Sequence, residues 1–277
     1  MRKQGSIGIF DSGFGGLAIL KEIQKKLPPY RYIYLGDTAR APYGSRSQES
    51  VYEFTRQAVD FLFEKGCEII VIACNTASAE ALRRIQRSYL PQHYPHRRVL
   101  GVLIPAAETA VLKTRNHRIG VLATEGTVRS GAFARELHKL DRTVKIFQQA
   151  APLLVPLVEE GEHKSKAAQL ILKNYLRPLL TNRIDTLILG CTHYGHLEPA
   201  VRKIVGKHAQ VISEGKVIGR KLKEYLMRHP EIESVLASKR PSIFYSTDLT
   251  GRFKRLGRSF LGRPIRPLRV VDLEKGQ

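Results

Sequence analysis

The sequence is poor in cysteine, with only Cys67, Cys74 and Cys191 among its 277 residues. An odd and low count does not build a disulfide framework, and no Cys-x-x-Cys pair is present. The nine histidines do not stand at zinc-site spacings from the cysteines. We therefore expect three reduced thiols and no bound metal.

Long apolar runs are also missing. No stretch approaches the roughly 18–20 apolar residues that a helix needs to cross a bilayer. Residues 1–4 lead straight into a strand-like run, without the apolar core and small-residue cleavage site of a signal peptide. From this pattern we expect a cytoplasmic protein with no membrane partner.

Phosphate-binding loops are absent as well. The sequence has no Walker-type loop, and Gly13-Phe-Gly15-Gly16 lacks the GxGxxG spacing of a dinucleotide site. We therefore expect no nucleotide cofactor.

Acidic residues are scarce, with 25 against 46 basic ones, which gives a net charge of +21 and a pI near 10.1. The basic residues cluster in two stretches: Arg83, Arg84, Arg87, Arg97 and Arg98, and then Lys239, Arg240, Arg252, Lys254, Arg255, Arg258, Arg263, Arg266 and Arg269. Such a surface attracts nucleic acid or acidic partners. A solvated basic surface is the plainer interpretation, and we favour it because no nucleic-acid-binding motif accompanies the charge.

What the sequence does contain is a regular alternation of short apolar runs and amphipathic stretches. Residues 6–10 read as a buried strand, and 17–27 as a helix with an apolar face. Further strands are expected at 32–35, 68–73, 99–103, 118–123, 144–147, 186–189, 210–212 and 242–245, further helices at 50–65, 77–89 and 216–228, and a linker at 89–98. Repeated strand–helix units predict an α/β protein whose parallel sheets are covered on both faces.

Two of these strands end in the same way. Glu68-Ile-Ile-Val-Ile-Ala-Cys74-Asn75-Thr76 resembles Asp185-Thr-Leu-Ile-Leu-Gly-Cys191-Thr192-His193. In open α/β sheets, ligands bind at the carboxyl ends of the strands. Both cysteines should therefore lie at functional edges, one in each half of the molecule.

Paired cysteines in this position favour proton chemistry. A helix N-terminus lowers the pKa of a thiol, and a thiol with a tuned pKa serves as a general base in one form and a general acid in the other. If Cys74 and Cys191 face one substrate from opposite walls, one removes a proton from carbon and the other returns a proton to the opposite face. Donors that stabilise the resulting enolate-like charge are expected from the loop groups near Asp11-Ser12 and Pro42-Tyr43-Gly44, and from Asn75, Thr76 and Thr192.

Plainer interpretations exist for each of these residues. A lone cysteine after an apolar strand is more often a small buried side chain, and Cys67, which enters its strand from the other end, is interpreted in that way. Asp11 can simply cap a helix, and His193 can be a hydrogen-bonded core histidine. A disulfide between Cys74 and Cys191 is a third possibility, which requires Cα atoms roughly 4.4–6.8 Å apart, closer than a substrate between them would permit.

Four motifs in collinear order resemble glutamate racemase, an isomerase that works without a cofactor in bacterial cell-wall (peptidoglycan) synthesis. They are Gly8-Ile-Phe-Asp-Ser-Gly-Phe-Gly-Gly-Leu17, Gly36-Asp-Thr-Ala-Arg-Ala-Pro-Tyr-Gly44, Ala73-Cys-Asn-Thr-Ala-Ser78 and Gly190-Cys-Thr-His-Tyr194. Weaker matches at 152–161 and 244–261 extend the similarity over most of the chain.

The resemblance implies a fold and a set of roles. Two similar parallel-sheet α/β domains, 1–98 with 211–277 and 99–210, would enclose the active site in the cleft between them. Cys74 and Cys191 would be the catalytic proton donors and acceptors, and the substrate would be lined by Asp11, Ser12, Tyr43, Gly44, Asn75, Thr76, Thr192 and His193. Asp11 and His193 would assist the cysteine on their respective sides, with Glu159 as a further candidate, and a homodimer is implied.

The sequence departs from the family pattern at a few positions. Leu103-Ile-Pro-Ala106 stands where an acidic residue before Pro-Gly is common, Ala151-Pro152 stands in place of Cys-Pro, and Ile212-Ser-Glu-Gly215 replaces a more usual Asp-Ser stretch. None of the three touches the cysteine motifs. They leave regulation and strict substrate identity open.

Two alternatives to glutamate racemisation therefore remain. The first is racemisation of aspartate or another acidic amino acid on the same scaffold. The second is a role in binding nucleic acid or an acidic protein through the basic surface, alone or beside catalysis, since some glutamate racemases inhibit DNA gyrase. Salt distinguishes this second role, because phosphate contacts weaken steeply as ionic strength rises.

Overall fold

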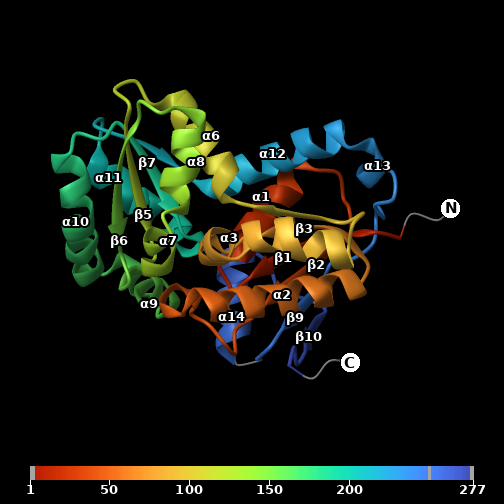
Figure 1. Cartoon of the computed structure of the whole chain (residues 1–277). Coiled ribbons are helices and arrows are strands. Elements are labelled where there is room, and N and C mark those ends of the chain that lie inside the picture. The colour runs from red at the N-terminus through yellow and green to blue at the C-terminus, as the bar shows by residue number, and fades with distance from the viewer. Residues whose placement is uncertain (1–3, 249–250, 275–277) are drawn as a thin grey trace.

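The described part of the chain forms two parallel β-sheets that lie side by side, and helices flank each sheet (Figure 1). A computed structural model describes residues 4–248 and 251–274; the side chains of residues 251 and 252 are not described. The arrangement confirms the predicted α/β class with two parallel sheets.

Within the described residues the first sheet has six strands in the order β10-β9-β2-β1-β3-β4, all parallel. Its strands are β1 (Ser6–Asp11), β2 (Tyr32–Gly36), β3 (Cys67–Ile72), β4 (Arg98–Gly101), β9 (Ile243–Ser246) and β10 (Leu268–Val270). β1 and β2 are buried along their whole length, as expected for central strands covered on both faces. The C-terminal strands β9 and β10 extend the sheet beyond β2.

The second sheet has four parallel strands in the order β6-β5-β7-β8. They are β5 (Arg118–Ala123), β6 (Lys145–Ala150), β7 (Thr186–Gly190) and β8 (Gln210–Ile212). The two predicted domain boundaries, at 98/99 and 210/211, fall at β4 of the first sheet and at β8 of the second. The division into domains itself stays a prediction.

Helices cover both sheets. They are α1 (Gly16–Lys26), α2 (Gln48–Glu64), α3 (Asn75–Glu80), α4 (Leu82–Arg84), α5 (Leu90–His93), α6 (Leu103–Lys113), α7 (Glu125–Arg129), α8 (Ala132–Leu140), α9 (Leu154–Glu159), α10 (Lys166–Thr181), α11 (Glu198–Val205), α12 (Glu214–Arg228), α13 (Pro230–Glu233) and α14 (Gly251–Leu261). Short 3₁₀ turns form at η1 (Tyr43–Ser45), η3 (Glu162–Lys164) and η4 (Thr192–Leu197), and η2 (Ile85–Tyr89) is a π turn. Among the described residues, no helix combines the length and apolar character that crossing a bilayer requires.

The structure corrects three local expectations. The helix expected over 77–89 is broken at Ala81, whose φ of −113° ends α3, and it continues as α4 and the π turn. The expected linker over 89–98 contains the short helix α5. The strand expected over 99–103 ends at Gly101, because α6 already begins at Leu103. Strand β10 went unpredicted because it has only three residues, of which Arg269 and Val270 are exposed, and so lacks the buried apolar run of the central strands.

The two sheets share one continuous apolar core. A single cluster of buried side chains runs from Ile7 and Leu20 of the first half to Val121 and Leu187 of the second. Helix α12 follows β8 and packs along α1, so it crosses from the second sheet to the first (Figure 1). The core therefore fixes the two halves against each other beside the strand ends.

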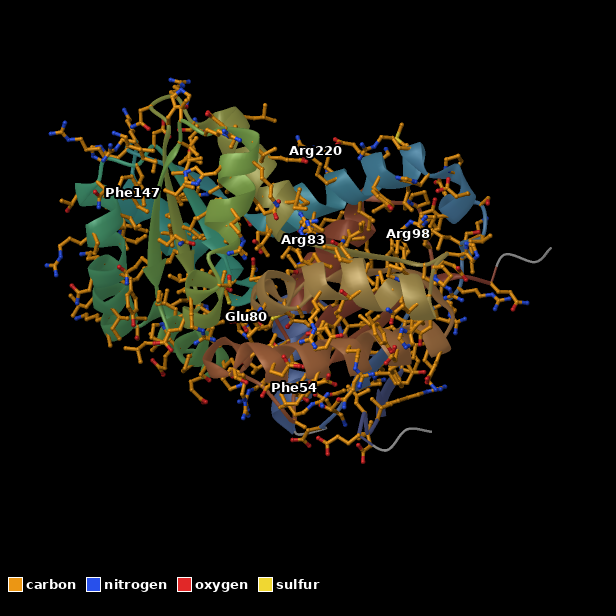
Figure 2. All side chains as sticks on the ribbon, viewed as in Figure 1. Phe54, Glu80, Arg83, Arg98, Phe147 and Arg220 are labelled. Carbon is orange, nitrogen blue, oxygen red and sulfur yellow. The ribbon has the colours of Figure 1, made fainter. Side chains whose placement is uncertain are left out.

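Ion pairs reinforce this junction on one side. Glu80 pairs with Arg129 of α7 at 3.0 Å, and Arg83 pairs with Glu136 of α8 at 3.0 Å. Figure 2 shows Glu80 and Arg83 on the part of the first half that faces the second. The arginine side chains are about half exposed, whereas the two carboxylates are largely buried, so each arginine compensates a charge that packing has removed from water.

Core packing predicts a large stability difference between two leucines. Leu20 is fully buried on α1, whereas Leu170 on α10 is 63% exposed. Leu20→Ala should lower the free energy of unfolding by about 2–5 kcal/mol, since it leaves a cavity in the shared core. Urea denaturation followed by circular dichroism measures this, with Leu170→Ala as the control of identical chemistry. Equal losses in the two variants would contradict the assignment of Leu20 to the core.

Candidate active site

The polar side chains at the junction come from the carboxyl ends of three central strands. Asp11 is the last residue of β1, Cys74 lies two residues beyond β3, and Cys191 directly follows β7. β1 and β3 pair in the first sheet and β7 is central in the second. Each sheet therefore presents one cysteine to the same junction, as the matched strand endings predict.

Cys74 occupies the N-cap position of α3 and is 6% exposed. The hydroxyl of Ser12 lies 3.4 Å from its sulfur. Ser12 belongs to the turn between β1 and α1, so the first sheet supplies both the thiol and its hydrogen-bond partner.

Cys191 occupies the N-cap position of η4 and is 8% exposed. The Nδ1 atom of His193 lies 3.9 Å from its sulfur, and the Nε2 atom of His193 lies 3.1 Å from Oε1 of Glu159. The carboxylate fixes the imidazole ring, so a chain of contacts runs from Glu159 through His193 to Cys191.

Asp11 and Thr192 connect the two halves directly. The Thr192 hydroxyl donates to Oδ1 of Asp11 at 3.4 Å, and the Gly13 amide donates to Oδ2 at 3.0 Å. The approach is so close that a Cβ atom on Gly15 would lie 2.1 Å from Thr192 Oγ1. Only glycine fits at position 15, which accounts for part of the Gly-Phe-Gly-Gly motif.

The loop that contains Tyr43 and Gly44 closes another side of the site. Tyr43 is buried and donates its hydroxyl proton to Asp37. A Cβ atom on Gly44 would lie 2.9 Å from Cβ of Thr124, so this loop also contacts the second half. Thr76 of α3 makes a 2.9 Å hydrogen bond with the same Thr124.

A small cavity of about 40 Å³ lies at the centre of these contacts. Its lining contains every predicted site residue except Asp11. The predicted residues in the lining are Ser12, Tyr43, Gly44, Cys74, Asn75, Thr76, Cys191, Thr192 and His193, and the others are Gly13, Ala41, Pro42, Thr124, Val155 and Glu159. A cavity of about 510 Å³ adjoins it and shares Ala41, Pro42, Gly44, Thr124, Val155 and Glu159. The wider cavity therefore offers a route to the two thiols.

Burial dominates the electrostatics of both thiols. Desolvation raises the pKa of Cys74 to about 11, with a further increase from Asp11, while the hydroxyl and amide of Ser12 and the Ala77 amide oppose it. Desolvation also raises the pKa of Cys191 well above its usual value, although a backbone hydrogen bond from His193 opposes the shift. The expectation that a helix N-terminus lowers these pKa values is wrong, because loss of water outweighs the amide dipoles here.

The same burial raises the pKa of Asp11. Its carboxyl is fully buried, and desolvation raises its pKa, while the charge of His193 and the hydrogen bonds from Gly16, Gly13 and Thr192 oppose the increase. Besides the local bond from the Gly13 amide, Asp11 accepts a hydrogen bond from Thr192 of the second half, so its side chain does more than cap the following helix.

Cys67 lies away from this cavity. It begins β3, at the opposite end of the strand from Cys74, and pairs with Ser6 of β1. It is fully buried, and it does not line the cavity.

Two further polar residues, neither of them a predicted site residue, belong to this neighbourhood. The expectation that the Ile212-Ser-Glu-Gly215 departure does not touch the cysteine motifs is wrong, because Glu214 accepts a hydrogen bond from Asn75. Thr124 follows β5, and Glu214 follows β8 by two residues. Both lie beyond the carboxyl end of a parallel strand, so the rule that located the cysteines applies to them as well. Within residues 4–248 and 251–274, no group of three or more His, Cys, Asp or Glu side chains is arranged to hold a metal ion.

Comparison with known proteins gives consistent matches. The family model "Asp/Glu/Hydantoin racemase" matches residues 17–218. The chain is 38% identical over 275 residues to the glutamate racemase of Bacillus cereus, which covers 99% of this chain and 100% of that protein. Its fold is similar to a crystal structure of a glutamate racemase from Bacillus anthracis, with a TM-score of 0.90 and 35% identity over 98% of this chain and 99% of that one. The crystal structure of the glutamate racemase of Francisella tularensis in complex with D-glutamate is also similar, with a TM-score of 0.89 and 31% identity over 99% of this chain and 100% of that one.

Burial of the thiols predicts an alkaline titration of Cys74. Because its folded pKa is raised, the protonated thiol contributes stability that is fully present below about pH 9 and is lost as the pH rises towards 11. The rate of Cys74 alkylation by iodoacetamide, followed by peptide mass spectrometry, should still be rising at pH 10. In urea-unfolded protein the rate should level off above about pH 9.5, about one unit beyond the ordinary thiol pKa. A folded protein whose Cys74 rate levels off at the same pH as in the unfolded protein would refute this account of the thiol.

Proposed function

The chain belongs to the Asp/Glu/hydantoin racemase family, and on this premise we propose that it interconverts L-glutamate and D-glutamate by proton transfer at the α-carbon. The observation that carries the proposal is that two buried thiols, one from each half of the molecule, line a single cavity. Their placement suits removal of a proton on one face and delivery on the other. The named relatives are glutamate racemases, which favours glutamate over aspartate as the substrate.

In the proposed reaction one cysteine acts as a thiolate and the other as a thiol. The thiolate takes the α-proton, leaving a carbanion whose charge spreads into the neighbouring carboxylate. The opposite thiol then donates its proton to carbon, which inverts the centre and exchanges the roles of the two sulfurs. No electron donor or acceptor is needed, so the step balances with substrate and protein alone.

The raised thiol pKa values fit this scheme. A thiol that resists ionisation becomes a strong base once it has lost its proton. The ammonium group of a bound amino acid supplies the nearby positive charge that favours the thiolate. By the family resemblance, Asp11 assists Cys74, on which its charge acts, and His193 with Glu159 assists Cys191, which His193 contacts.

Stabilisation of the enolate-like intermediate is assigned to hydrogen-bond donors around the cavity. The hydroxyls of Ser12, Thr76 and Thr192 and the side-chain amide of Asn75 lie along its lining. Preorganised donors in a site that excludes water act strongly on developing charge. By the family resemblance, Cys74 removes the proton from D-glutamate and Cys191 from L-glutamate.

The wider biological predictions follow from the same proposal. Supply of D-glutamate for peptidoglycan, a cytoplasmic location, and a homodimer remain predictions. Binding of nucleic acid or an acidic protein through the basic surface also remains a prediction, and we place it second. Exposed cations on α14, among them Lys254, Arg255 and Arg258, are the described residues that favour it.

Proton exchange with solvent tests the reaction directly. Purified protein with D-glutamate in deuterated water, without added cofactor, should lose the circular dichroism signal of the substrate. NMR should show deuterium at the α-carbon of the product, because each thiol exchanges with solvent between turnovers. Turnover of aspartate but not of glutamate would change the assigned substrate and leave the mechanism intact. No racemisation of any acidic amino acid would refute the proposal.

Cysteine variants test the two-base assignment. Cys74→Ser and Cys191→Ser should each lower kcat for racemisation by at least about 100-fold, since a serine hydroxyl is a far weaker acid and base catalyst than a thiol. Cys67→Ser is the matched control and should keep nearly full activity, because Cys67 lies outside the cavity. Wild-type activity in either the Cys74 or the Cys191 variant would refute the two-cysteine mechanism.

A further inference from the structure

Glu214 is a buried carboxyl group at the back of the candidate site. It is the first residue of α12, directly after the N-cap Ser213, and only 4% of it is exposed. Helix α12 follows the second sheet and packs on α1 of the first. Glu214 therefore lies where the two halves meet, two residues beyond the end of β8.

One oxygen of the Glu214 carboxyl group has a hydrogen-bond partner and the other has none. Oε2 of Glu214 accepts a 2.7 Å hydrogen bond from Nδ2 of Asn75, the residue after Cys74. Oε1 of Glu214 and Oδ1 of Asn75 are both buried without a hydrogen-bond partner in the described part of the chain. A buried carboxylate with an unpartnered oxygen is costly, which favours the protonated acid.

Glu214 also borders the second cysteine. It lines a cavity of about 230 Å³ together with Cys191 and Thr192. Because Cys191 lines both this cavity and the small cavity that holds Cys74, Glu214 and the substrate space lie on two sides of the same thiol. A negative charge on Glu214 raises the pKa of Cys191, as the charges of Cys74 and Asp11 also do.

Other charged and titratable groups surround Glu214. They are Lys21 and Glu22 of α1, His196 of η4, Glu198 of α11, Lys216 of α12, and Asp11, Cys74 and Cys191 at the strand ends. Burial, followed by the charges of His163 and His193, lowers the pKa of His196 to about 4, so this ring is neutral in the physiological range. None of these groups forms a hydrogen bond with the Glu214 carboxyl group.

From this geometry we propose that Glu214 is a protonatable positioning residue, which holds the Asn75 side chain behind the catalytic pocket and controls through its charge how readily Cys191 ionises. The catalytic part of this inference rests on the proposed racemase function. The electrostatic part does not, because it concerns two groups of the free protein.

The sign of the effect follows from burial. Desolvation raises the pKa of Glu214 to about 8, while the hydrogen bond from Asn75 opposes the increase. Below pH 8 the group is neutral and adds no charge that opposes ionisation of Cys191. Above pH 8 it becomes an anion and disfavours the Cys191 thiolate. The neutral form contributes stability that is fully present near pH 4.5 and is lost as the pH rises through 8.

The decisive experiment compares the wild type with Glu214→Gln, which keeps the shape of the side chain and an acceptor for Asn75. The rates of iodoacetamide alkylation of Cys191 should agree at pH 6.5. By pH 9.5 Cys191 in Glu214→Gln should react at least about threefold faster, because no anion opposes its ionisation. Glu224→Gln, which removes an exposed carboxylate from the same helix, should match the wild type at both pH values.

Cys67 serves as the internal control for folding in the same digest, since it is fully buried away from the site. Equal rates at Cys191 in the wild type and Glu214→Gln at every pH would overturn the proposal. A parallel acceleration of Cys67 and Cys191 at all pH values would overturn it as well, because it would show general loosening. These readouts need no turnover, so they stand even if the racemase proposal fails.

Kinetics then test the positioning role. For L-glutamate, kcat/KM of the wild type should flatten above pH 8, whereas that of Glu214→Gln should continue to rise. Glu214→Leu removes the acceptor and should raise KM by about threefold or more, as expected for the loss of one positioned hydrogen bond, with kcat less affected. An active enzyme whose Glu214 variants keep the wild-type pH profile and KM would reject the inference and leave the racemase function intact.

Discussion

The contact between Thr192 and Asp11 is the interaction on which the rest of the junction depends. It joins the carboxyl end of β7 in one sheet to that of β1 in the other, at the point where each sheet also presents a cysteine. Without a close approach here, the two thiols would belong to separate surfaces. The glycine at position 15 permits the approach, because any side chain there would collide with Thr192.

This closeness determines the electrostatics of the junction. Water is excluded from the sulfur atoms, so desolvation is the largest influence on the pKa of both thiols and of Asp11. Thiols that stay protonated at neutral pH are poor nucleophiles in the free protein, and they ionise at that pH only when a nearby cation stabilises the thiolate. A substrate that carries an ammonium group meets this requirement. The same exclusion of water accounts for a neutral Glu214 behind the site.

The two halves resemble each other at the cysteines but differ in what surrounds them. On the first-sheet side, Cys74 has the Ser12 hydroxyl and the carboxyl of Asp11 nearby. On the second-sheet side, Cys191 has an imidazole that is held by Glu159. The proposed proton transfer from opposite faces requires two groups of matched chemistry but not two identical environments. The asymmetry allows the pKa of each sulfur to be set separately, as we propose for Glu214 and Cys191.

The sequence by itself determined the strand–helix alternation, the parallel sheets and the location of Asp11, Cys74 and Cys191 just beyond strand ends, because local apolar patterns and the strand-end rule depend only on neighbouring residues. The collinear motifs likewise identified the family. Only the tertiary structure decided that Thr124 and Glu214 join this neighbourhood, that Gly15 must be glycine, and that the thiol pKa values are raised and not lowered. Each of these depends on how closely segments far apart in sequence approach and on how much water they exclude, and neither quantity is encoded in local sequence patterns.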